Sequence, residues 1–179
     1  MLLTSSDHDA RMQREETNKM FLRALFAFLA LPTVVAGVIP WLLLPADRWR
    51  TDGTILGWPV LSFGVFILLW CVRDFYVIGK GTLAPWDPPK KLVIVGLYRL
   101  VRNPMYIGVL GCVAGFSLIV GSPVTSAYTF LLAFAFHLRV LFYEEPALSR
   151  LFGEEWIRYR DRVSRWLPHL SHPTLRVLG

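Results

Sequence analysis

The sequence of 179 residues contains few of the residues that build disulfide frameworks or metal centres, with two cysteines and four histidines. Cys71 and Cys112 both fall inside apolar runs, where we expect buried, reduced thiols without a chemical role. His169 and His172 lie near the end of the sequence, and two histidines there are too few to predict a metal site. The sequence therefore offers no disulfide framework and predicts no metal ion.

Other common signals are also missing. Gly79 and Gly81 form an isolated G-x-G with no preceding strand and no third glycine, so a Rossmann dinucleotide site is not predicted. The first apolar run is long, starts far from the N-terminus and is not followed by a small-residue cleavage site, so we expect it to remain in the mature protein. The net charge of +6 requires no nucleic acid partner, since anionic lipid head groups explain it.

Long apolar runs dominate the sequence, in which 54% of the residues are hydrophobic and the mean hydropathy is +0.46. Four runs are each close to the roughly 20 residues that a helix needs to cross a bilayer. They are residues 21–44, 55–79, 104–121 and 124–143. We therefore predict an all-α polytopic membrane protein with four transmembrane helices. Because only residues 121–123 join the last two runs, these two should form a tight helical hairpin.

Basic residues are distributed unevenly between the loops of this arrangement. Lys and Arg number four up to residue 23, five in 80–102 and six after 143, but two in 45–53 and none in 121–123. By the positive-inside rule, both termini and the middle loop are cytoplasmic. An aromatic belt is expected at the opposite membrane surface, formed by Trp41, Trp49 and Trp58. We expect an integral protein of a bacterial inner membrane, in contact with membrane lipids.

We interpret residues 1–179 as one integral-membrane domain. Its parts are a polar lead-in (1–20), two spans (21–79), a cofactor-binding and catalytic core (80–167) and a tail (168–179). Proline and glycine in the first span favour a kink, at Pro32, Gly37 and Pro40. Small residues on the third span favour close approach of another helix, namely Gly108, Gly111, Ala114, Gly115 and Ser117. Apolar residues recur every three or four positions from Leu148 to Trp166, which predicts an amphipathic helix on the membrane surface and a possible roof for the site.

The stretch of residues 96–108, G-L-Y-R-L-V-R-N-P-M-Y-I-G, leads into the third span. Pro104 restricts the residue before it, so Asn103 is expected as the N-cap of a helix that starts at Pro104. The start of such a helix offers free N–H groups and a positive dipole end to an anionic ligand group. Arg99 and Arg102 strengthen this preference. The simpler alternative is a membrane helix anchored by its flanking arginines.

Charged residues also lie at the expected cytoplasmic ends of the second and fourth spans. Arg73 and Asp74 form either a surface ion pair or part of a site. Arg139 falls within the fourth run, and Glu144 and Glu145 follow it. Negative charge at the C-terminal end of a helix opposes the helix dipole. The paired glutamates therefore indicate basic neighbours or a cationic ligand.

Three motifs follow one another between residues 79 and 167. They are G-T-L-A-P, then L-V-x-x-G-x-Y-R-x-V-R-N-P-M-Y-x-G, then Y-E-E-P-A-L-x-x-x-F-G-x-x-W-x-x-Y-x-x-x-V-x-R-W-L-P. In order and spacing they resemble the integral-membrane methyltransferases, a family that includes isoprenylcysteine carboxyl methyltransferases and phospholipid N-methyltransferases. N-P-M-Y and Y-E-E-P are more similar to the phospholipid branch. Asn103 departs from the isoprenylcysteine enzymes, which commonly have His there, and Leu97 stands where many relatives have Pro.

The resemblance implies S-adenosylmethionine as methyl donor, bound without a Rossmann domain between the cytoplasmic ends of the last two spans. The candidate cofactor contacts are Lys90, Lys91, Leu92, Val93, Tyr98, Arg102, Asn103, Pro104, Met105, Tyr106, Glu144 and Glu145. Glu144 or Glu145 would hold the donor's ammonium or ribose hydroxyls, and Arg102 or the helix start would hold its carboxylate. Tyr98 or Tyr106 would face the sulfonium.

The methyl acceptor determines which residues would be catalytic. An amine head group must lose a proton before attack, and Glu145 is the candidate base. A prenylcysteine carboxylate is already ionised and needs a cation to orient it, for which Arg139 is the candidate. A small lipid-like or hydrophobic acceptor is the first choice. The alternative outside enzymology is a transport or scaffold protein, in which Arg73, His137 and Arg139 would form a polar relay between helices.

Overall fold

The computed structural model describes residues 32–47, 50–78, 92 and 94–168, and every regular element in these ranges is helical. The elements are η1 (Val34–Val38), α2 (Ile39–Leu43), η2 (Leu44–Ala46), α3 (Gly57–Ile78), η3 (Gly96–Arg99), α4 (Pro104–Val120), α5 (Pro123–Arg139), η4 (Val140–Glu144), α6 (Glu145–Phe152) and α7 (Glu154–Arg162). Strand-like pairing there is limited to one bridge between Val101 and Ser164. The all-α prediction is therefore confirmed over the described part of the chain.

The helices agree with the predicted apolar runs. Two are long and apolar enough to cross a membrane, Gly57–Asp74 and the continuous helix Pro123–Phe152. Two shorter apolar helices, Val34–Leu43 and Pro104–Val120, occupy the other two runs. The first half of the first run, residues 21–31, lies outside the described residues.

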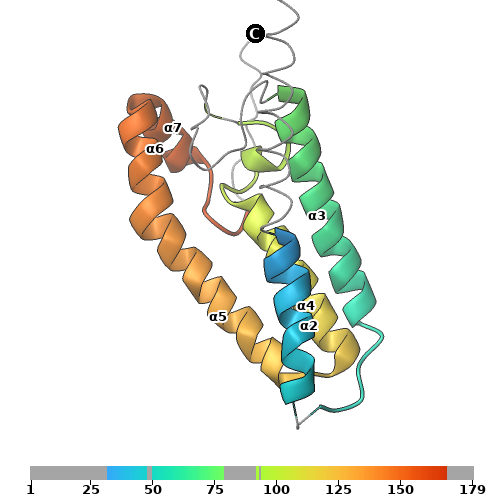
Figure 1. Cartoon of the computed structure of the whole chain (residues 1–179). Helices are drawn as coiled ribbons and strands as arrows, with labels where there is room; N and C mark the ends of the chain where they lie inside the picture. Colours follow the sequence, from blue (N-terminus) through green and yellow to red (C-terminus); the bar gives the residue numbers. More distant parts are fainter. Residues whose placement is uncertain (1–31, 48–49, 79–91, 93, 169–179) are drawn as a thin grey trace, which may run out of the picture.

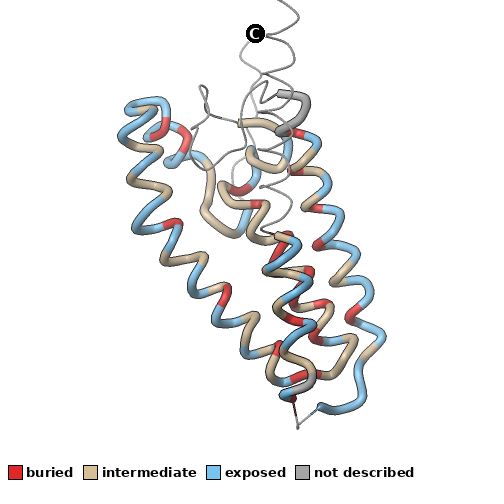
Figure 2. Tube along the Cα trace, in the orientation of Figure 1, coloured by how far each residue is buried: buried red, intermediate tan, exposed pale blue. Residues whose placement is uncertain are grey.

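The outer side of α5 and η4 is apolar and exposed. Phe130, Phe134 and Phe142 are each at least 60% exposed. Exposed positions recur along this side of the helix in Figure 2, whereas buried ones face the other helices. A helix with large apolar side chains on its outer face suits a lipid environment. The membrane character predicted from the apolar runs is thus supported by the arrangement of the helices.

Helices α3 and α4 pack side by side along their length (Figure 1). Their backbones approach so closely that a methyl group on Gly64 would lie 2.5 Å from the amide nitrogen of Cys112 and 2.7 Å from the carbonyl carbon of Gly111. A methyl group on Gly115 would lie 2.6 Å from Cα of Leu61. Glycine therefore permits the contact on both helices, which confirms the close approach predicted from the small residues of the third run.

The turn between α4 and α5 is as short as predicted. Gly121 ends α4 in the left-handed conformation, with φ +60°. Ser122 caps α5, since its hydroxyl accepts a hydrogen bond from the amide of Thr125 at 3.1 Å. The buried carboxylate of Asp47 accepts hydrogen bonds from the Ser122 hydroxyl and from the amide of Val124. Side-chain and backbone bonds thus fix this end of the bundle.

Away from the turn, α4 and α5 diverge (Figure 1). Midway along the two helices, buried Val109, Val113 and Leu132 form a small apolar core between them. The first span lies against this core, and its Val35 carbonyl accepts a hydrogen bond from the Tyr128 hydroxyl at 3.0 Å. The opposite ends of α4 and α5 are therefore free to hold other side chains between them.

Two widened turns of π-helix interrupt the apolar helices, and each comes directly before a proline. In η4, the amide of Glu145 donates to the Val140 carbonyl five residues earlier, and Pro146 follows. In η1, the same pattern precedes Pro40. A proline ring inside a helix clashes with the carbonyl four residues back, and a widened turn relieves this clash. This π turn lies in the first span, where the sequence predicts a kink at its prolines and glycine.

The C-terminal helix differs from its prediction. Instead of one amphipathic helix from Leu148 to Trp166, the chain forms α6 and α7, which are separated by Gly153 at φ +50°. Glycine readily adopts a positive φ, which ends α6 and redirects the chain. After α7 ends at Arg162, the irregular residues 163–167 return to the start of α4, where the amide of Arg102 donates to the Ser164 carbonyl at 2.8 Å. The predicted continuous helix is therefore wrong.

Candidate functional site

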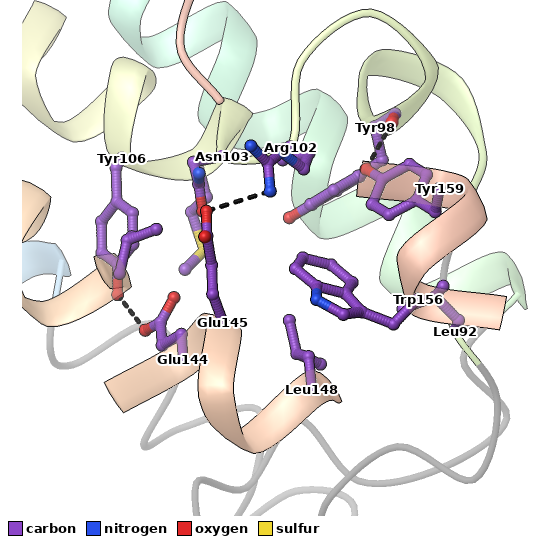
Figure 3. Close-up of a pocket in the computed structure, with 12 residues that line it drawn as sticks. Leu92, Tyr98, Arg102, Asn103, Tyr106, Glu144, Glu145, Leu148, Trp156 and Tyr159 are labelled. Carbon is purple, nitrogen blue, oxygen red and sulfur yellow. Dashed lines mark hydrogen bonds and ion pairs between the residues drawn. The ribbon is translucent and has the colours of Figure 1, made fainter. Parts of the chain in front are cut away.

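A cavity of about 210 Å³ lies where the start of α4, the η4–α6 segment and α7 converge (Figure 3). Eight of the predicted cofactor contacts line it: Leu92, Tyr98, Arg102, Asn103, Met105, Tyr106, Glu144 and Glu145. Four further lining residues were not among those predictions: Val140, Leu148, Trp156 and Tyr159. The cavity thus joins the two motif regions that the sequence places before the third span and after the fourth.

The other predicted residues are placed differently. Pro104 is buried as the first residue of α4 and does not line the cavity. Lys90, Lys91 and Val93 lie outside the described residues. Arg139 contacts the cavity indirectly, through the side chains of Tyr106 and Glu144.

Glu145 is the centre of one charged cluster. Its two carboxylate oxygens accept hydrogen bonds from Arg165, with Nε at 2.7 Å from Oε1 and Nη2 at 2.9 Å from Oε2. Nη1 of Arg102 lies 3.0 Å from the same Oε1. The bond to Glu145 raises the pKa of the Arg165 guanidinium, whereas burial lowers the pKa of Arg102. The basic neighbours expected for the paired glutamates are thus present.

Arg102 retains hydrogen-bonding capacity within this cluster. Its side chain is 9% exposed, and its Nε and Nη1 make no hydrogen bond to any described residue. Nη1 is within ion-pair distance of Glu145 but makes no hydrogen bond to it, and Nε is a second buried N–H group without a hydrogen-bond partner among the described residues. The guanidinium carbon also lies 5.6 Å from the centre of the Trp156 ring. A buried N–H group without an acceptor is costly, and a ligand anion would satisfy it.

Glu144 belongs to a second cluster, on the other side of the cavity. Its Oε1 accepts a hydrogen bond from the Tyr106 hydroxyl and another from Nε of Arg139, at 2.9 Å. Nε of Arg139 also lies 3.1 Å from the Tyr106 hydroxyl oxygen. The Tyr106 ring packs against Phe136, with ring centres 4.3 Å apart. A carboxylate and a phenol are therefore held together at the edge of the cavity.

Both glutamates reach the cavity because of the π turn before Pro146. Figure 3 shows the two side chains pointing to different parts of the site, Glu144 toward Tyr106 and Glu145 toward Arg102. In the segment E-E-P, the two glutamates supply the charges, and the proline favours the π turn that orients their side chains.

The helix α7 covers one side of the cavity, in the position suggested for a roof. It contributes two buried aromatic side chains, Trp156 and Tyr159. The Tyr159 hydroxyl donates to the backbone carbonyl of Tyr98 at 2.6 Å, and burial raises the pKa of this phenol. Trp156 and Tyr159 are three residues apart, so the sequence places them on one face of a helix. The fold shows that this face lines a cavity.

The extended segment after α7 holds the start of α4. Asn103 occupies the N-cap position of α4, but its side chain does not cap the helix and instead donates to the Arg165 carbonyl at 3.2 Å. The prediction that Asn103 is the N-cap residue of a helix starting at Pro104 is therefore confirmed, although its side chain makes no capping hydrogen bond. The first amides of α4 thus remain free of a side-chain cap from Asn103. Trp166 follows and donates from Nε1 to Nδ1 of His137 at 3.1 Å.

The chain is similar to known membrane methyltransferases. Residues 53–155 match the family model described as phospholipid methyltransferase. A probable protein-S-isoprenylcysteine O-methyltransferase of Oryza sativa subsp. indica is 31% identical over 86 residues, which cover 48% of this chain and 45% of the relative. Protein-S-isoprenylcysteine O-methyltransferase A of Arabidopsis thaliana is 30% identical over 122 residues, which cover 64% of this chain and 62% of the relative. Protein-S-isoprenylcysteine O-methyltransferase B of the same plant is 28% identical over 81 residues, which cover 45% of this chain and 41% of the relative.

These similarities are partial in length. The chain spans about half the length of the curated relatives it matches. No solved structure matches the chain significantly. The matched residues 53–155 nevertheless include α3, α4, α5 and both cavity glutamates.

Proposed function

Since the chain belongs to the phospholipid methyltransferase family, we propose that it is an integral-membrane methyltransferase that transfers a methyl group from S-adenosylmethionine to a lipid-like acceptor. The acceptor is a phospholipid amine or a small hydrophobic substrate. The observation that carries the proposal is Arg102, whose buried Nε–H has no hydrogen-bond partner among the described residues and whose side chain lines a cavity together with carboxylates and aromatic rings. A largely apolar cavity with a few charged groups, at the end of apolar helices, suits a donor with charged groups and an acceptor held in the bilayer.

The charges of the cavity match those of the donor. S-adenosylmethionine carries a carboxylate and an ammonium, and when bound it supplies a methyl group attached to a sulfonium. Arg102 has the donors to hold a carboxylate, and Glu144 has an acidic group to hold an ammonium or hydroxyl. The rings of Tyr106 and Trp156 offer faces to a cation. The residues present therefore fit the donor.

The roles of the two glutamates differ in this proposal. Glu145 is held by two arginines, so it is a poor proton acceptor and serves to position Arg102 and Arg165. Glu144 and Tyr106 form a carboxylate–phenol pair at the cavity edge, where Glu144 has one arginine partner, the half-exposed Arg139, instead of two. We therefore transfer the role of general base, predicted for Glu145, to this pair.

A second candidate function is methylation of an isoprenylcysteine carboxylate. The names of the plant relatives favour it, because they are protein-S-isoprenylcysteine O-methyltransferases. Arg139 would then orient the acceptor carboxylate, since its half-exposed guanidinium lies beside Tyr106 and Glu144. This reaction requires no general base because its acceptor is already ionised. The two candidates therefore differ in their need for the Glu144 carboxylate.

One experiment separates them. Purified protein in nanodiscs receives methyl-labelled donor with either phosphatidylethanolamine or N-acetyl-farnesylcysteine, and mass spectrometry identifies the labelled group. We expect label on the amine, and we expect Glu144→Gln to reduce its rate by about 100-fold, within the usual range for loss of a general base. The matched control is Glu155→Gln, at an exposed position of α7, which should leave the rate unchanged. Label on the farnesylcysteine carboxyl alone would replace the first proposal with the second.

We further propose four membrane spans with both termini and the cavity on the cytoplasmic side of a bacterial inner membrane. The four apolar helical segments and the positive-inside distribution support this topology. The exposed Asp52 precedes α3 at the end opposite the cavity. A cysteine introduced by Asp52→Cys should react with an impermeant maleimide added outside spheroplasts. Reaction only after the membrane is opened would reverse the topology.

A further inference from the structure

Arg139 carries hydrogen-bond donors that the proposed transfer to an amine does not use. Its Nε is occupied, since it donates to Oε1 of Glu144 at 2.9 Å and lies 3.1 Å from the Tyr106 hydroxyl oxygen. Its two terminal nitrogens make no hydrogen bond to any described residue, and the side chain is 53% exposed. One edge of the guanidinium is therefore tied to the carboxylate–phenol pair, whereas the other edge is open to a ligand.

An exposed tyrosine lies beside this guanidinium. The guanidinium carbon of Arg139 is 5.5 Å from the centre of the Tyr143 ring, and the Tyr143 residue is 64% exposed. Attraction between a cation and a ring face favours this position of the guanidinium. Tyr143 is the first residue of the motif Y-E-E-P, and it does not line the cavity. Arg139 thus connects a side-chain pair of the cavity with a side chain on the outer surface of the helix.

Arg139 and Tyr143 lie at the depth of lipid head groups in the proposed topology. The helix α5 runs for 17 residues up to Arg139, and about 20 residues are needed to cross a bilayer. The neighbouring Leu141 and Phe142 are exposed and apolar, so this part of the surface suits contact with lipid. Arginine and tyrosine side chains at this depth place their polar ends among the phosphates of the head groups.

The arrangement suits a head group that contains both a phosphate and an amine. In phosphoethanolamine, one oxygen and two carbons separate the phosphorus from the nitrogen. In the protein, Glu144 is one hydrogen bond from Nε of Arg139, and the terminal nitrogens are two covalent bonds further along the same planar group. A phosphate on the open edge of Arg139 therefore leaves the amine within reach of Glu144 and Tyr106, which line the cavity assigned to the methyl donor.

We propose that Arg139 and Tyr143 form the binding site for the phosphate of the methyl acceptor, which makes a phospholipid amine the substrate class. The inference rests on the proposed methyltransferase function and narrows it, because a hydrophobic amine without phosphate would not use this site. The terminal N–H groups of Arg139 donate to phosphate oxygens, and the Tyr143 ring holds the guanidinium in place. Arg139 acts in binding, whereas the Glu144–Tyr106 pair takes the proton of the amine.

The test compares two acceptor analogues that differ in the phosphate. They are decylphosphoethanolamine and 2-decyloxyethylamine, which share the tail and the terminal amine. Isothermal titration calorimetry uses the full chain with S-adenosylhomocysteine in dodecyl maltoside, a detergent without phosphate. We expect the phosphate analogue to bind about tenfold more tightly, since a hydrogen bond between charged groups contributes about that much in affinity. Arg139→Gln should abolish this preference, whereas the matched control Arg158→Gln, at an exposed arginine of α7, should keep it.

A smaller effect is expected for the ring beside the guanidinium. Tyr143→Ala should reduce the preference for the phosphate analogue by about threefold, the scale of an exposed cation–π contact. Because Tyr143 is exposed, we expect this variant to keep its affinity for S-adenosylhomocysteine. It therefore decides the case in which Arg139→Gln loses S-adenosylhomocysteine together with the preference. A reduced preference in Tyr143→Ala would then support the site, and an unchanged preference would overturn it.

The remaining outcomes separate the phosphate site from the proposed function. Equal binding of both analogues by a wild type that binds S-adenosylhomocysteine would overturn the site, as would an unchanged preference in Arg139→Gln. N-acetyl-farnesylcysteine, added as a third probe, tests the other anion. If only this carboxylate binds in an Arg139-dependent way, the arginine belongs to the second candidate function and the phosphate site is wrong. A wild type that does not bind S-adenosylhomocysteine contradicts the proposed function instead.

Discussion

The two sides of α4 are built in opposite ways. On one side, glycines allow α3 to pack against α4 backbone to backbone. On the other side, α5 contacts α4 near the short turn and then diverges, and the space at its far end is occupied by charged and aromatic side chains (Figures 1 and 3). The same helix therefore has one rigid partner and one partner that leaves room for a ligand.

This difference suggests how a small membrane protein can remain stable while it holds charged side chains around a cavity. Close helix packing stabilises α3 and α4 through van der Waals contact, which needs no polar groups. The start of α4, with Arg102 and Asn103, is thereby fixed on a stable pair. The α5 side supplies the carboxylates, of which Glu145 is balanced by Arg102 and Arg165 of other segments and Glu144 by Arg139 of α5 itself. Stability and binding are thus assigned to different faces of α4.

The largest effect is expected on the close-packed side. Gly64→Leu would push a branched side chain into the backbone of α4 at Gly111 and Cys112. We expect a loss of about 3 kcal/mol in unfolding free energy, the upper range for overpacking a core. Thermal unfolding in nanodiscs measures it. Gly37→Leu is the matched control, because nothing lies within 4 Å of a methyl group there; equal losses in both variants would show that the close contact is not what stabilises the pair.

The next effect is expected on the open side. Glu145→Gln leaves Arg102 and Arg165 without their shared counter-charge. We expect a loss of about 2 kcal/mol in stability, less than for a fully buried pair because Arg165 is partly exposed, and a loss of S-adenosylhomocysteine binding of about 100-fold. Calorimetry measures both quantities. If Glu145→Gln bound the ligand normally, the cluster would not belong to the cofactor site.

Much of this arrangement could be predicted from the sequence. The lengths of the apolar runs predicted the helices, and the short stretch of residues 121–123 predicted the turn. Both depend on local properties of the chain. The family resemblance also named eight residues that line one cavity. The predictions of the helices and of the turn succeeded because the relevant information lies in short segments.

Other parts depend on contacts between distant segments. The sequence correctly suggested Asn103 as the N-cap residue of α4, but not that its side-chain amide donates to Arg165, 62 residues away. One helix was predicted across Gly153, because the apolar period continues through it while the backbone does not. Trp156 and Tyr159 look like an ordinary apolar helix face until α7 is folded over the cavity. Local patterns cannot specify such long-range partners.

The smallest effect is expected at the turn where the two sides of α4 meet. Asp47→Ala removes the acceptor for the Ser122 hydroxyl and the Val124 amide, so two donors at the start of α5 lose their partner. We expect a loss of about 1–2 kcal/mol in unfolding free energy, against no change for Asp52→Ala at an exposed aspartate. Because the turn lies at the end opposite the cavity, the affinity for S-adenosylhomocysteine should stay the same. A weaker affinity in Asp47→Ala would mean that the angle between α4 and α5, set at the turn, controls the shape of the cavity.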